Sequence, residues 1–167
     1  MDLPLAVMVT IPEPWQGDKT ISRTKRDLYQ YYAILMEPWD GPASILFSDG
    51  DVVGAVLDRN GLRPSRYYVT SDDRLILSSG VLDIPADRIV EKSRLQPGRM
   101  LLVDTRAGRI IGDEALKETY AARQPYGEWL DKNLVHLSDL SIPNRRVENR
   151  SREALARLQK AFGYTYE

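Results

Sequence analysis

The sequence predicts an α+β fold in which antiparallel β-sheets are flanked by helices. Three observations support this class: a helical pattern of apolar residues before residue 38, short β-rich runs separated by turn residues over 43–112, and a helical period again after Asp113. The chain of 167 residues contains 43% hydrophobic and 28% charged residues, which is ordinary for a folded protein. This length accommodates one compact domain with an appendage.

Two segments precede the β-rich region. The apolar run 3–15 fits either a buried strand or a buried helix, because so short a run has no decisive periodicity. A helix is expected to begin near Thr24, where Thr24 and Asp27 form a T-x-x-D start, and to end at Pro38. One side of this helix would carry the apolar and aromatic residues Leu28, Tyr31, Tyr32 and Leu35.

Turn residues divide the β-rich region into hairpins. The Asp-Gly pair at 49–50 tolerates positive φ and joins the runs ASILF and DVVGAVL. The polar residues 71–73 join RYYVT to RLILS. A third group of runs, RIVEKSRL, GRMLLVDT and GRIIGD, turns around 97–98 and 107–108. We therefore expect a meander, in which each strand pairs with the next one along the chain.

Helices are expected again toward the C-terminus. Asp113 would cap a segment that ends before Pro125, and residues 126–134 would form a further short helix. Ser151 would cap a last helix, which stops at Gly163 because a glycine after the final turn adopts positive φ easily.

The charge balance argues against broad electrostatic attraction to other macromolecules or to lipid. The 23 basic and 24 acidic residues nearly cancel, so we expect no nucleic-acid partner and no membrane partner. The apolar run from Leu3 to Ile11 lacks a basic flank and is far shorter than a membrane span. A cytoplasmic location is the simplest expectation.

The chain contains no cysteine, which excludes several kinds of site. Within these 167 residues there can be no disulfide, no thiolate nucleophile and no cysteine-bound zinc ion or iron–sulfur cluster. His136 is the single histidine, so a histidine-rich metal site is excluded as well. Asp49 and Asp51 do not follow the calcium-loop pattern. The sequence therefore predicts no metal site and no catalytic residue within the chain.

Asp58 begins the charged loop DRNGLRP, which joins two expected strands. Gly61 can adopt positive φ, and Asp58 could bond the loop amides or pair with Arg63. One interpretation is a structural loop braced internally by Asp58, Arg59, Asn60, Gly61 and Arg63. The other is a site at which Arg59 or Arg63 meets a carboxylate ligand. We favour the structural loop because ligand sites are few, and we assign no substrate-binding residue.

Several segments, in order along the chain, carry a family resemblance: LPLAVMVTIPEPW, MEPWDGPASILFSDG, GAVLDRNGLRPSRYYVTSDD, RLQPGRMLLVDT, PYGEWL and AFGYTYE. They resemble the glutamine amidotransferase domain of the glutamate synthase large chain, and the likeness extends over nearly the entire sequence. Hairpins with Asp-Gly turns are common, whereas DRNGLRPSRYY followed by RLQPGRMLLVDT is hard to obtain from generic strand chemistry.

The resemblance implies an N-terminal-nucleophile fold with four layers, αββα, of which this chain would be the C-terminal part. In such class II amidotransferases a terminal cysteine attacks the side-chain amide of glutamine, its α-amino group serves as the base, and asparagine and backbone donors hold the oxyanion. The cysteine and an HNGEIN-like oxyanion loop would precede the matched region. Asn60 lies in DRNGLRP rather than in HNGEIN, so the oxyanion role is not assigned to it.

The resemblance also implies a division into domains. Residues 1–136 would be the C-terminal part of the amidotransferase domain, residues 137–150 a connector, and residues 151–167 the start of the central synthase domain. The complete enzyme would form glutamate from glutamine and 2-oxoglutarate with FMN, an iron–sulfur cluster, and electrons from NAD(P)H or ferredoxin. None of these cofactors is expected to have its ligand set in this chain.

We therefore expect a piece of glutamate synthase that supports the glutaminase site and is inactive alone, because it lacks the nucleophile. Its partners would be the remainder of glutamate synthase, namely an upstream nucleophile segment and downstream synthase domains, with glutamine as the substrate of the complete domain. The alternative is a non-catalytic binding or regulatory module that retains the amidotransferase sheet.

Overall fold

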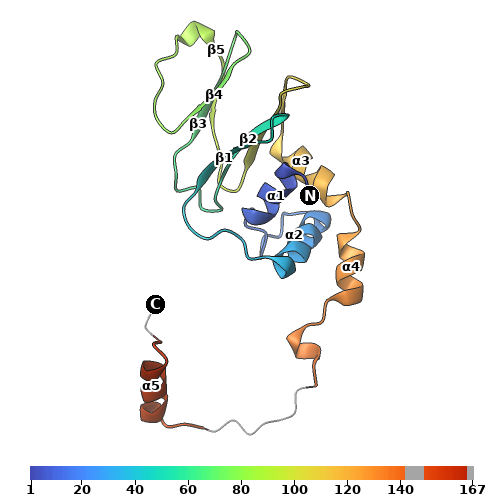
Figure 1. Ribbon diagram of the computed structural model, residues 1–167, viewed down its shortest axis with the longest axis vertical. Coiled ribbons are helices and arrows are strands. Elements are labelled where there is room, and N and C mark those ends of the chain that lie inside the picture. The colour runs from blue at the N-terminus through green and yellow to red at the C-terminus, as the bar shows by residue number, and fades with distance from the viewer. Residues whose placement is uncertain (142–148, 165–167) are drawn as a thin grey trace. The chain divides into compact units, whose positions relative to one another are not determined.

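The protein is represented by a computed structural model that describes residues 1–141 and 149–164 (Figure 1). The chain divides into two compact units, Met1–Leu134 and Val135–Glu167. The first unit holds the sheets and most of the helices. The domain boundary predicted at residue 136 stays a prediction, and half of the predicted connector 137–150, residues 142–148, lies outside the described residues.

The apolar opening of the chain is a helix. Helix α1 (Leu3–Thr10) begins at Asp2, whose Oδ1 accepts the backbone N–H of Leu5 at 3.3 Å. Capping by Asp2 and a proline in the first turn favour a helix over a strand here. Its buried residues are Pro4, Leu5, Met8 and Val9.

Helix α2 (Arg23–Leu35) starts earlier than predicted. Ser22, rather than Thr24, is the cap, and its Oγ accepts the backbone N–H of Lys25 at 3.3 Å. Leu28 and Tyr29 are almost fully buried, whereas Leu35 is 63% exposed. Leu35 is exposed because it lies in the last turn, beyond the part of α2 that contacts the core.

Seven strands form two antiparallel sheets within the described residues. Sheet A contains β1 (Ser44–Ser48), β2 (Val52–Leu57), β6 (Met100–Asp104) and β7 (Arg109–Ile111), in the order β1-β2-β6-β7. Sheet B contains β3 (Arg66–Thr70), β4 (Leu75–Ser78) and β5 (Ile89–Arg94), in the order β4-β3-β5. The predicted hairpins β1–β2, β3–β4 and β6–β7 are confirmed.

The predicted meander is wrong. Strand β5 pairs with β3 rather than with β6, and β6 pairs with β2. The chain changes sheets twice, over residues 58–65 and 95–99, and these two crossings form one corner. The backbone N–H of Leu95 donates to the carbonyl of Ser65 at 3.0 Å, and that of Gly98 donates to the carbonyl of Asp58 at 3.1 Å. Strand pairing stops at the corner because the crossing contains proline, which has no N–H to donate.

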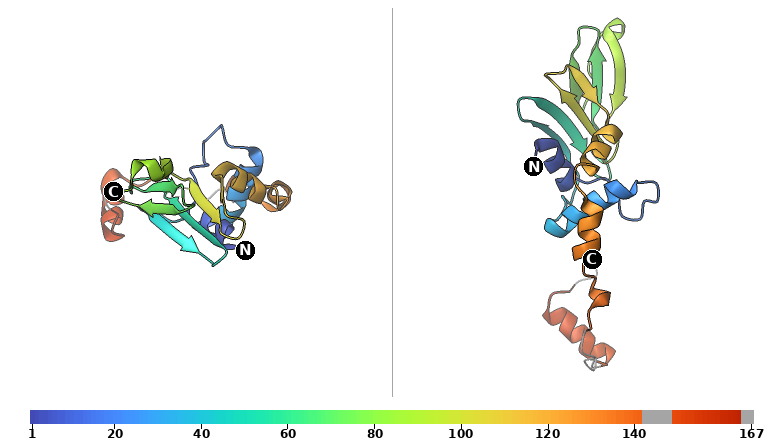
Figure 2. Two further views of the ribbon diagram at one scale, coloured as in Figure 1. Left: turned by 90° about the horizontal axis from the view of Figure 1, so that it is seen from above. Right: turned by 90° about the vertical axis from the view of Figure 1, so that its right-hand side faces the viewer.

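Each face of sheet A packs against a different layer. One face, with Val56, Met100 and Leu102, packs against α1, α2, α3 (Asp113–Ala121) and α4 (Tyr126–Asn133). The other face, with Ala55, Leu57 and Leu101, packs against the sheet B residues Tyr67, Leu75 and Leu77. The first unit thus has a helical layer, sheet A and sheet B in succession, and Figure 2 shows it from two further sides. The predicted α+β class is confirmed.

Asp113 has a different role from the one predicted. The cap of α3 is Gly112, and Asp113 is the first helical residue. Its Oδ1 accepts the backbone N–H of Met100 at 2.8 Å, so the carboxylate ties the start of α3 to β6.

In the second unit, the short 3₁₀ turn Leu137–Asp139 precedes α5 (Arg152–Ala161). Ser151 caps α5 by accepting the backbone N–H of Ala154 at 3.2 Å, and Gly163 follows the helix with φ +72°, both as predicted. In the described part of the chain, no helix combines the length and apolar character needed to cross a bilayer. The expected cytoplasmic location stays a prediction.

Gly61 provides a direct test of the corner. Its φ is +60°, and a Cβ at this position would lie 2.6 Å from Cγ of Pro97. Gly61→Ala should lower the free energy of unfolding by about 2 to 5 kcal/mol, combining left-handed strain with overpacking. The matched control is Gly108→Ala, since Gly108 has φ +59° but no atom within 4 Å of the added Cβ. For Gly108→Ala, urea unfolding should show a decrease in the free energy of unfolding of only about 1 to 2 kcal/mol. Equal decreases for the two variants would contradict the close packing of Gly61 against Pro97.

Candidate functional site

Asp58 organises the predicted loop from a buried position at the corner. It is only 4% exposed, and its Oδ1 accepts the backbone N–H of Ala43 at 3.1 Å. Its Oδ2 accepts the backbone N–H groups of Asn60 at 2.9 Å and Gly61 at 3.2 Å. Burial raises the pKa of Asp58, but these backbone donors outweigh it and hold the pKa below its ordinary value of 3.8. The ionised carboxylate therefore fixes the shape of the loop.

The two arginines of the loop do not pair with Asp58. Among the described residues Asp58 makes no ion pair with Arg63, which was one of the two arrangements the sequence allowed. Arg59 approaches Asp40 instead, with 3.8 Å between Nη2 and Oδ1. Both side chains are largely exposed, so this contact contributes little. The structure thus brings Asp58, Asn60 and Gly61 together and leaves the guanidinium groups of Arg59 and Arg63 facing two different cavities.

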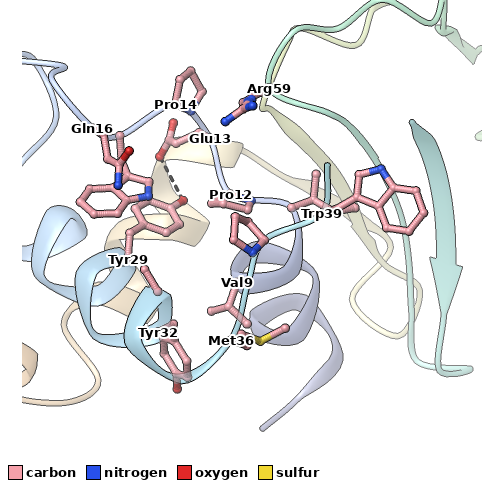
Figure 3. A pocket seen from close by; sticks show the side chains of 14 residues that line it. Val9, Pro12, Glu13, Pro14, Gln16, Tyr29, Tyr32, Met36, Trp39 and Arg59 are labelled. Atoms are coloured by element: carbon pink, nitrogen blue, oxygen red, sulfur yellow. Dashed lines mark hydrogen bonds between the residues drawn. The ribbon is translucent and has the colours of Figure 1, made fainter. Parts of the chain in front are cut away.

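Arg59 lines a cavity of about 370 Å³, which we call the aromatic pocket (Figure 3). Its walls come from α1, α2 and the segments that follow each helix. Trp15 and Tyr29 stack with ring centroids 6.4 Å apart, and Trp39 lies on the side of Arg59. At the back, the hydroxyl of Tyr29 donates to Oε1 of Glu13 at 3.1 Å. The pocket therefore suits a ligand or side chain with an apolar body.

A network of ionic contacts lies behind the aromatic pocket, and it centres on Lys117. This lysine is only 2% exposed. Its Nζ donates to the carbonyl of Gly98 at 2.9 Å and pairs with Oδ1 of Asp113 at 2.9 Å and Oε2 of Glu13 at 3.2 Å. A buried ammonium with three oxygen partners holds the corner, α3 and the segment after α1 together.

The network continues to α2 through two further cations. Nη1 of Arg99 lies 2.8 Å from Oδ2 of Asp113 and 3.2 Å from Oε2 of Glu114. The buried Lys25 donates from Nζ to Oε1 of Glu114 at 2.6 Å. The hydrogen bond from Lys25 is the main reason that the pKa of Glu114 lies below its ordinary value, and the bond to Asp113 raises the pKa of Arg99. The charges of this network neutralise one another and brace the fold.

Tyr29 remains protonated at physiological pH. Burial is the largest cause that raises the pKa of its hydroxyl, and the neighbouring charge of Glu13 raises it further. Tyr29 therefore acts as a hydrogen-bond donor to Glu13. Of the described residues, none that lines the aromatic pocket offers a thiol, a free amine or a hydroxyl nucleophile other than tyrosine. Among the described residues no group of three or more His, Cys, Asp or Glu side chains could hold a metal ion. The pocket offers a binding surface, and its carboxylate, Glu13, is held by Tyr29 and Lys117.

The remaining polar residues considered in the sequence serve local structure. Oδ1 of Asp49 accepts the backbone N–H groups of Asp51 at 3.0 Å and Val52 at 2.9 Å, which closes the first hairpin turn. His136 belongs to the second unit, where its backbone N–H donates to Oδ2 of Asp139 at 3.2 Å.

Sequence reasoning missed Glu13, Lys25 and Lys117. The spacing of Asp113 and Lys117 as an i,i+4 pair was the one available signal, because the other partners come from segments far apart in the sequence.

Residues 1–129 match the family described as class-II glutamine amidotransferases. The chain is 51% identical over 162 residues to the glutamate synthase (NADPH) large chain of Bacillus subtilis, which covers 96% of this chain and 10% of that protein. It is 49% identical over 179 residues to the glutamate synthase (NADH) of Schizosaccharomyces pombe, covering 100% of this chain and 8% of that protein. For ferredoxin-dependent glutamate synthase 2 of Synechocystis the identity is 42% over 166 residues, covering 97% and 11%. The chain thus spans about a tenth of the length of these curated relatives.

Proposed function

This chain belongs to the class-II glutamine amidotransferases and is homologous to glutamate synthase large chains, and on that premise we propose that its sheets support a glutaminase site that releases ammonia from glutamine. In the complete enzyme this ammonia is used to form glutamate from 2-oxoglutarate. The contribution of the 167 residues is architectural.

The antiparallel sheets with flanking helices are consistent with the N-terminal-nucleophile fold of this family. That fold has four layers, two helical layers enclosing two sheets. In the described residues a helical layer, sheet A and sheet B account for three of them. Residues 1–136 would therefore be one part of the domain, and the further helical layer and strands would come from polypeptide beyond these residues.

The observation that carries the proposal is an open area on the inner face of sheet A. Leu46, Val53 and Ile110 point to the same face as Ala55 and Leu57, as their strand register requires. Sheet B covers Ala55 and Leu57, yet Leu46 is 62%, Val53 43% and Ile110 41% exposed. A contiguous apolar area in the middle of a sandwich fold indicates a surface for another polypeptide. We call Leu46, Val53 and Ile110 the open face.

The chemistry also requires a second source of residues. Hydrolysis of a glutamine amide in this family proceeds by attack of a cysteine thiolate on the amide carbon, followed by loss of ammonia and hydrolysis of the acyl-enzyme. The 167 residues contain no cysteine. The proposal therefore assigns the thiolate and its oxyanion donors to polypeptide beyond these residues, which would dock on the open face.

The cofactors of the complete enzyme belong elsewhere in this proposal. A chain without cysteine does not fit an iron–sulfur cluster, and the described residues hold no metal-binding group. FMN and the cluster would lie in the synthase domains, for which residues 151–167 would be the start and 137–150 the connector. The names of the relatives include NADPH, NADH and ferredoxin as electron donors, and one of these classes would serve the complete enzyme here.

Reconstitution in trans tests the proposal. The 167-residue chain is mixed with the cysteine-bearing amidotransferase segment of the Bacillus subtilis relative, and ammonia release from glutamine is measured. We expect no ammonia from either polypeptide alone and saturable release from the mixture. Val53→Glu on the open face should lower this rate at least tenfold at equal concentrations. The matched control is Val90→Glu, at an exposed valine of sheet B, which should leave the rate unchanged.

Two results would contradict the proposal. One is a stable complex that releases no ammonia, which would favour the non-catalytic binding or regulatory module instead. The other is an equal loss of rate for Val53→Glu and Val90→Glu, which would show that the open face is not the docking surface.

A further inference from the structure

A second cavity at the corner is lined by three arginines. It has a volume of about 320 Å³, and Arg63, Arg66 and Arg94 contribute to its walls. Arg63 comes from the first crossing, Arg66 from β3 and Arg94 from β5. Among the residues that the structure describes, no aspartate or glutamate lines this cavity, which we call the arginine pocket.

In the part of the chain that the structure describes, the three guanidinium groups have no internal partner. Arg66 and Arg94 are directly opposite each other in the pairing of β3 with β5, an arrangement of like charges that destabilises a sheet. Within the described ranges, none of the three side chains forms an ion pair or a hydrogen bond. Elsewhere in the structure Arg99 and Arg106 each lie 2.8 Å from a carboxylate oxygen. Three positive charges are thus concentrated in the arginine pocket without compensation.

The walls of the arginine pocket are held in place before any ligand arrives. The backbone hydrogen bond from Leu95 to Ser65 joins the residues beside Arg94 and Arg66 at 3.0 Å. The Asp58 carboxylate fixes the loop that leads to Arg63, and Gly61 packs against Pro97. A preformed wall lowers the entropy cost of binding, which leaves only the arginine side chains to be ordered.

We propose that the arginine pocket binds a small dianion, either a dicarboxylate or a phosphate. A guanidinium fork matches the oxygens of a carboxylate or phosphate, and two facing forks with a third arginine suit two negative charges. The volume lies at the lower end of the range for ligand pockets, which fits a small molecule. Because all three arginines are exposed, the dissociation constant is expected to be on the order of 1 mM. This site does not depend on the proposed glutaminase role.

Titration of the 167-residue chain tests the proposal. Glutarate and inorganic phosphate are added separately at low ionic strength, and the Nε–H signals of the arginines are followed by NMR. We expect saturable shifts at Arg63, Arg66 and Arg94 with at least one of the two ions, and weaker binding as salt is added. Arg66→Gln should weaken binding at least tenfold. Arg74→Gln is the control, because Arg74 is an exposed arginine that already pairs with Asp72 at 3.0 Å.

Thermal unfolding gives a second readout. Arg94→Thr removes the like-charge pair on neighbouring strands, so without ligand it should raise the melting temperature by about 1 to 3 °C. The same variant should lose the stabilisation that the dianion gives to the unmodified chain. A lower melting temperature in Arg94→Thr, together with unchanged stabilisation by the ion, would overturn the proposal.

The titrations with glutarate and with phosphate distinguish a dicarboxylate ligand from a phosphorylated one. Tighter binding of glutarate indicates a dicarboxylate ligand, and tighter binding of phosphate indicates a phosphorylated one; either supports the site. The proposal is overturned if neither ion saturates the shifts by about 20 mM, or if Arg66→Gln and Arg74→Gln behave alike. It is also overturned if an acidic peptide binds tenfold more tightly than both ions, since the pocket would then be a protein-docking surface.

Discussion

Lys117→Ala is expected to lower the free energy of unfolding by about 3 to 5 kcal/mol, the range found when one partner of a buried ion pair is removed. Lys117 is 2% exposed, and its loss would leave the carboxylate of Glu13, 12% exposed, without an ion-pair partner among the described residues. Asp113, also 12% exposed, would keep Arg99 as its remaining cation. The carbonyl of Gly98 would lose its donor as well. Urea unfolding at pH 7 measures the change.

Lys132→Ala is the matched control for this variant. Like Lys117, Lys132 pairs with a carboxylate on its own helix, with 3.7 Å between Nζ and Oε2 of Glu128, but its side chain is 73% exposed. Its removal should change the free energy of unfolding by less than about 0.5 kcal/mol. Similar effects at Lys117 and Lys132 would mean that the network behind the aromatic pocket does not brace the fold.

Asp58→Asn is expected to lower the free energy of unfolding by about 2 to 4 kcal/mol, because hydrogen bonds to a buried charge are strong. The new NH₂ group would also point its hydrogens at one or more of the backbone N–H donors. The carboxylate accepts the N–H groups of Ala43, Asn60 and Gly61, and an asparagine has only one oxygen to offer them. Asp49→Asn in the exposed hairpin turn should have a smaller effect. Equal losses would contradict the bracing role of Asp58.

The stability that Asp58 provides should decrease as the pH falls below about 4. The pKa of Asp58 in the folded chain lies below 3.8, its ordinary value, so the unfolded chain takes up its proton first as the pH falls. The contribution is complete above about pH 4 and declines as the pH falls toward and through the folded pKa. The difference in unfolding midpoint between the unmodified chain and Asp58→Asn should therefore be constant from pH 7 to about pH 5 and shrink below pH 4. A difference in unfolding midpoint that grows as the pH falls would contradict a pKa of Asp58 that is lower in the folded than in the unfolded chain.

Local signals in the sequence predicted most elements. Short apolar runs joined by an Asp-Gly, a Ser-Asp-Asp and an Ala-Gly turn predicted the three hairpins, since register within a hairpin depends on neighbouring residues. The pairing of β6 with β2 and of β5 with β3 had no such signal. It depends on two crossings whose hydrogen bonds join Leu95 to Ser65 and Gly98 to Asp58, far apart in the sequence, and no periodicity encodes such a contact. The predicted start of α2 was wrong by two residues, because both Ser22 and Thr24 are residue types that cap helices.

The loop at Asp58 could be predicted from the sequence, whereas the ionic network behind the aromatic pocket could not, again because only local contacts leave a signal in the sequence. Asp58, Asn60 and Gly61 are adjacent, so an aspartate that bonds its own loop could be inferred from DRNGLRP. Glu13, Lys25 and Lys117 are each unremarkable in their own segments, and only the tertiary fold brings them together. The arginine pocket is likewise visible only after β3 and β5 are paired, because that register places Arg66 opposite Arg94.

The central claim is that these residues support a glutaminase whose attacking sulfur lies on other polypeptide. Intact-mass analysis tests it most directly: the 167-residue chain and the cysteine-bearing segment are treated together with a diazoketone analogue of glutamine, which alkylates an activated thiolate. The account predicts a mass increase on the added segment alone, formed faster when the 167-residue chain is present. A mass increase on the 167-residue chain, or a labelling rate of the segment that the chain does not change, would contradict it.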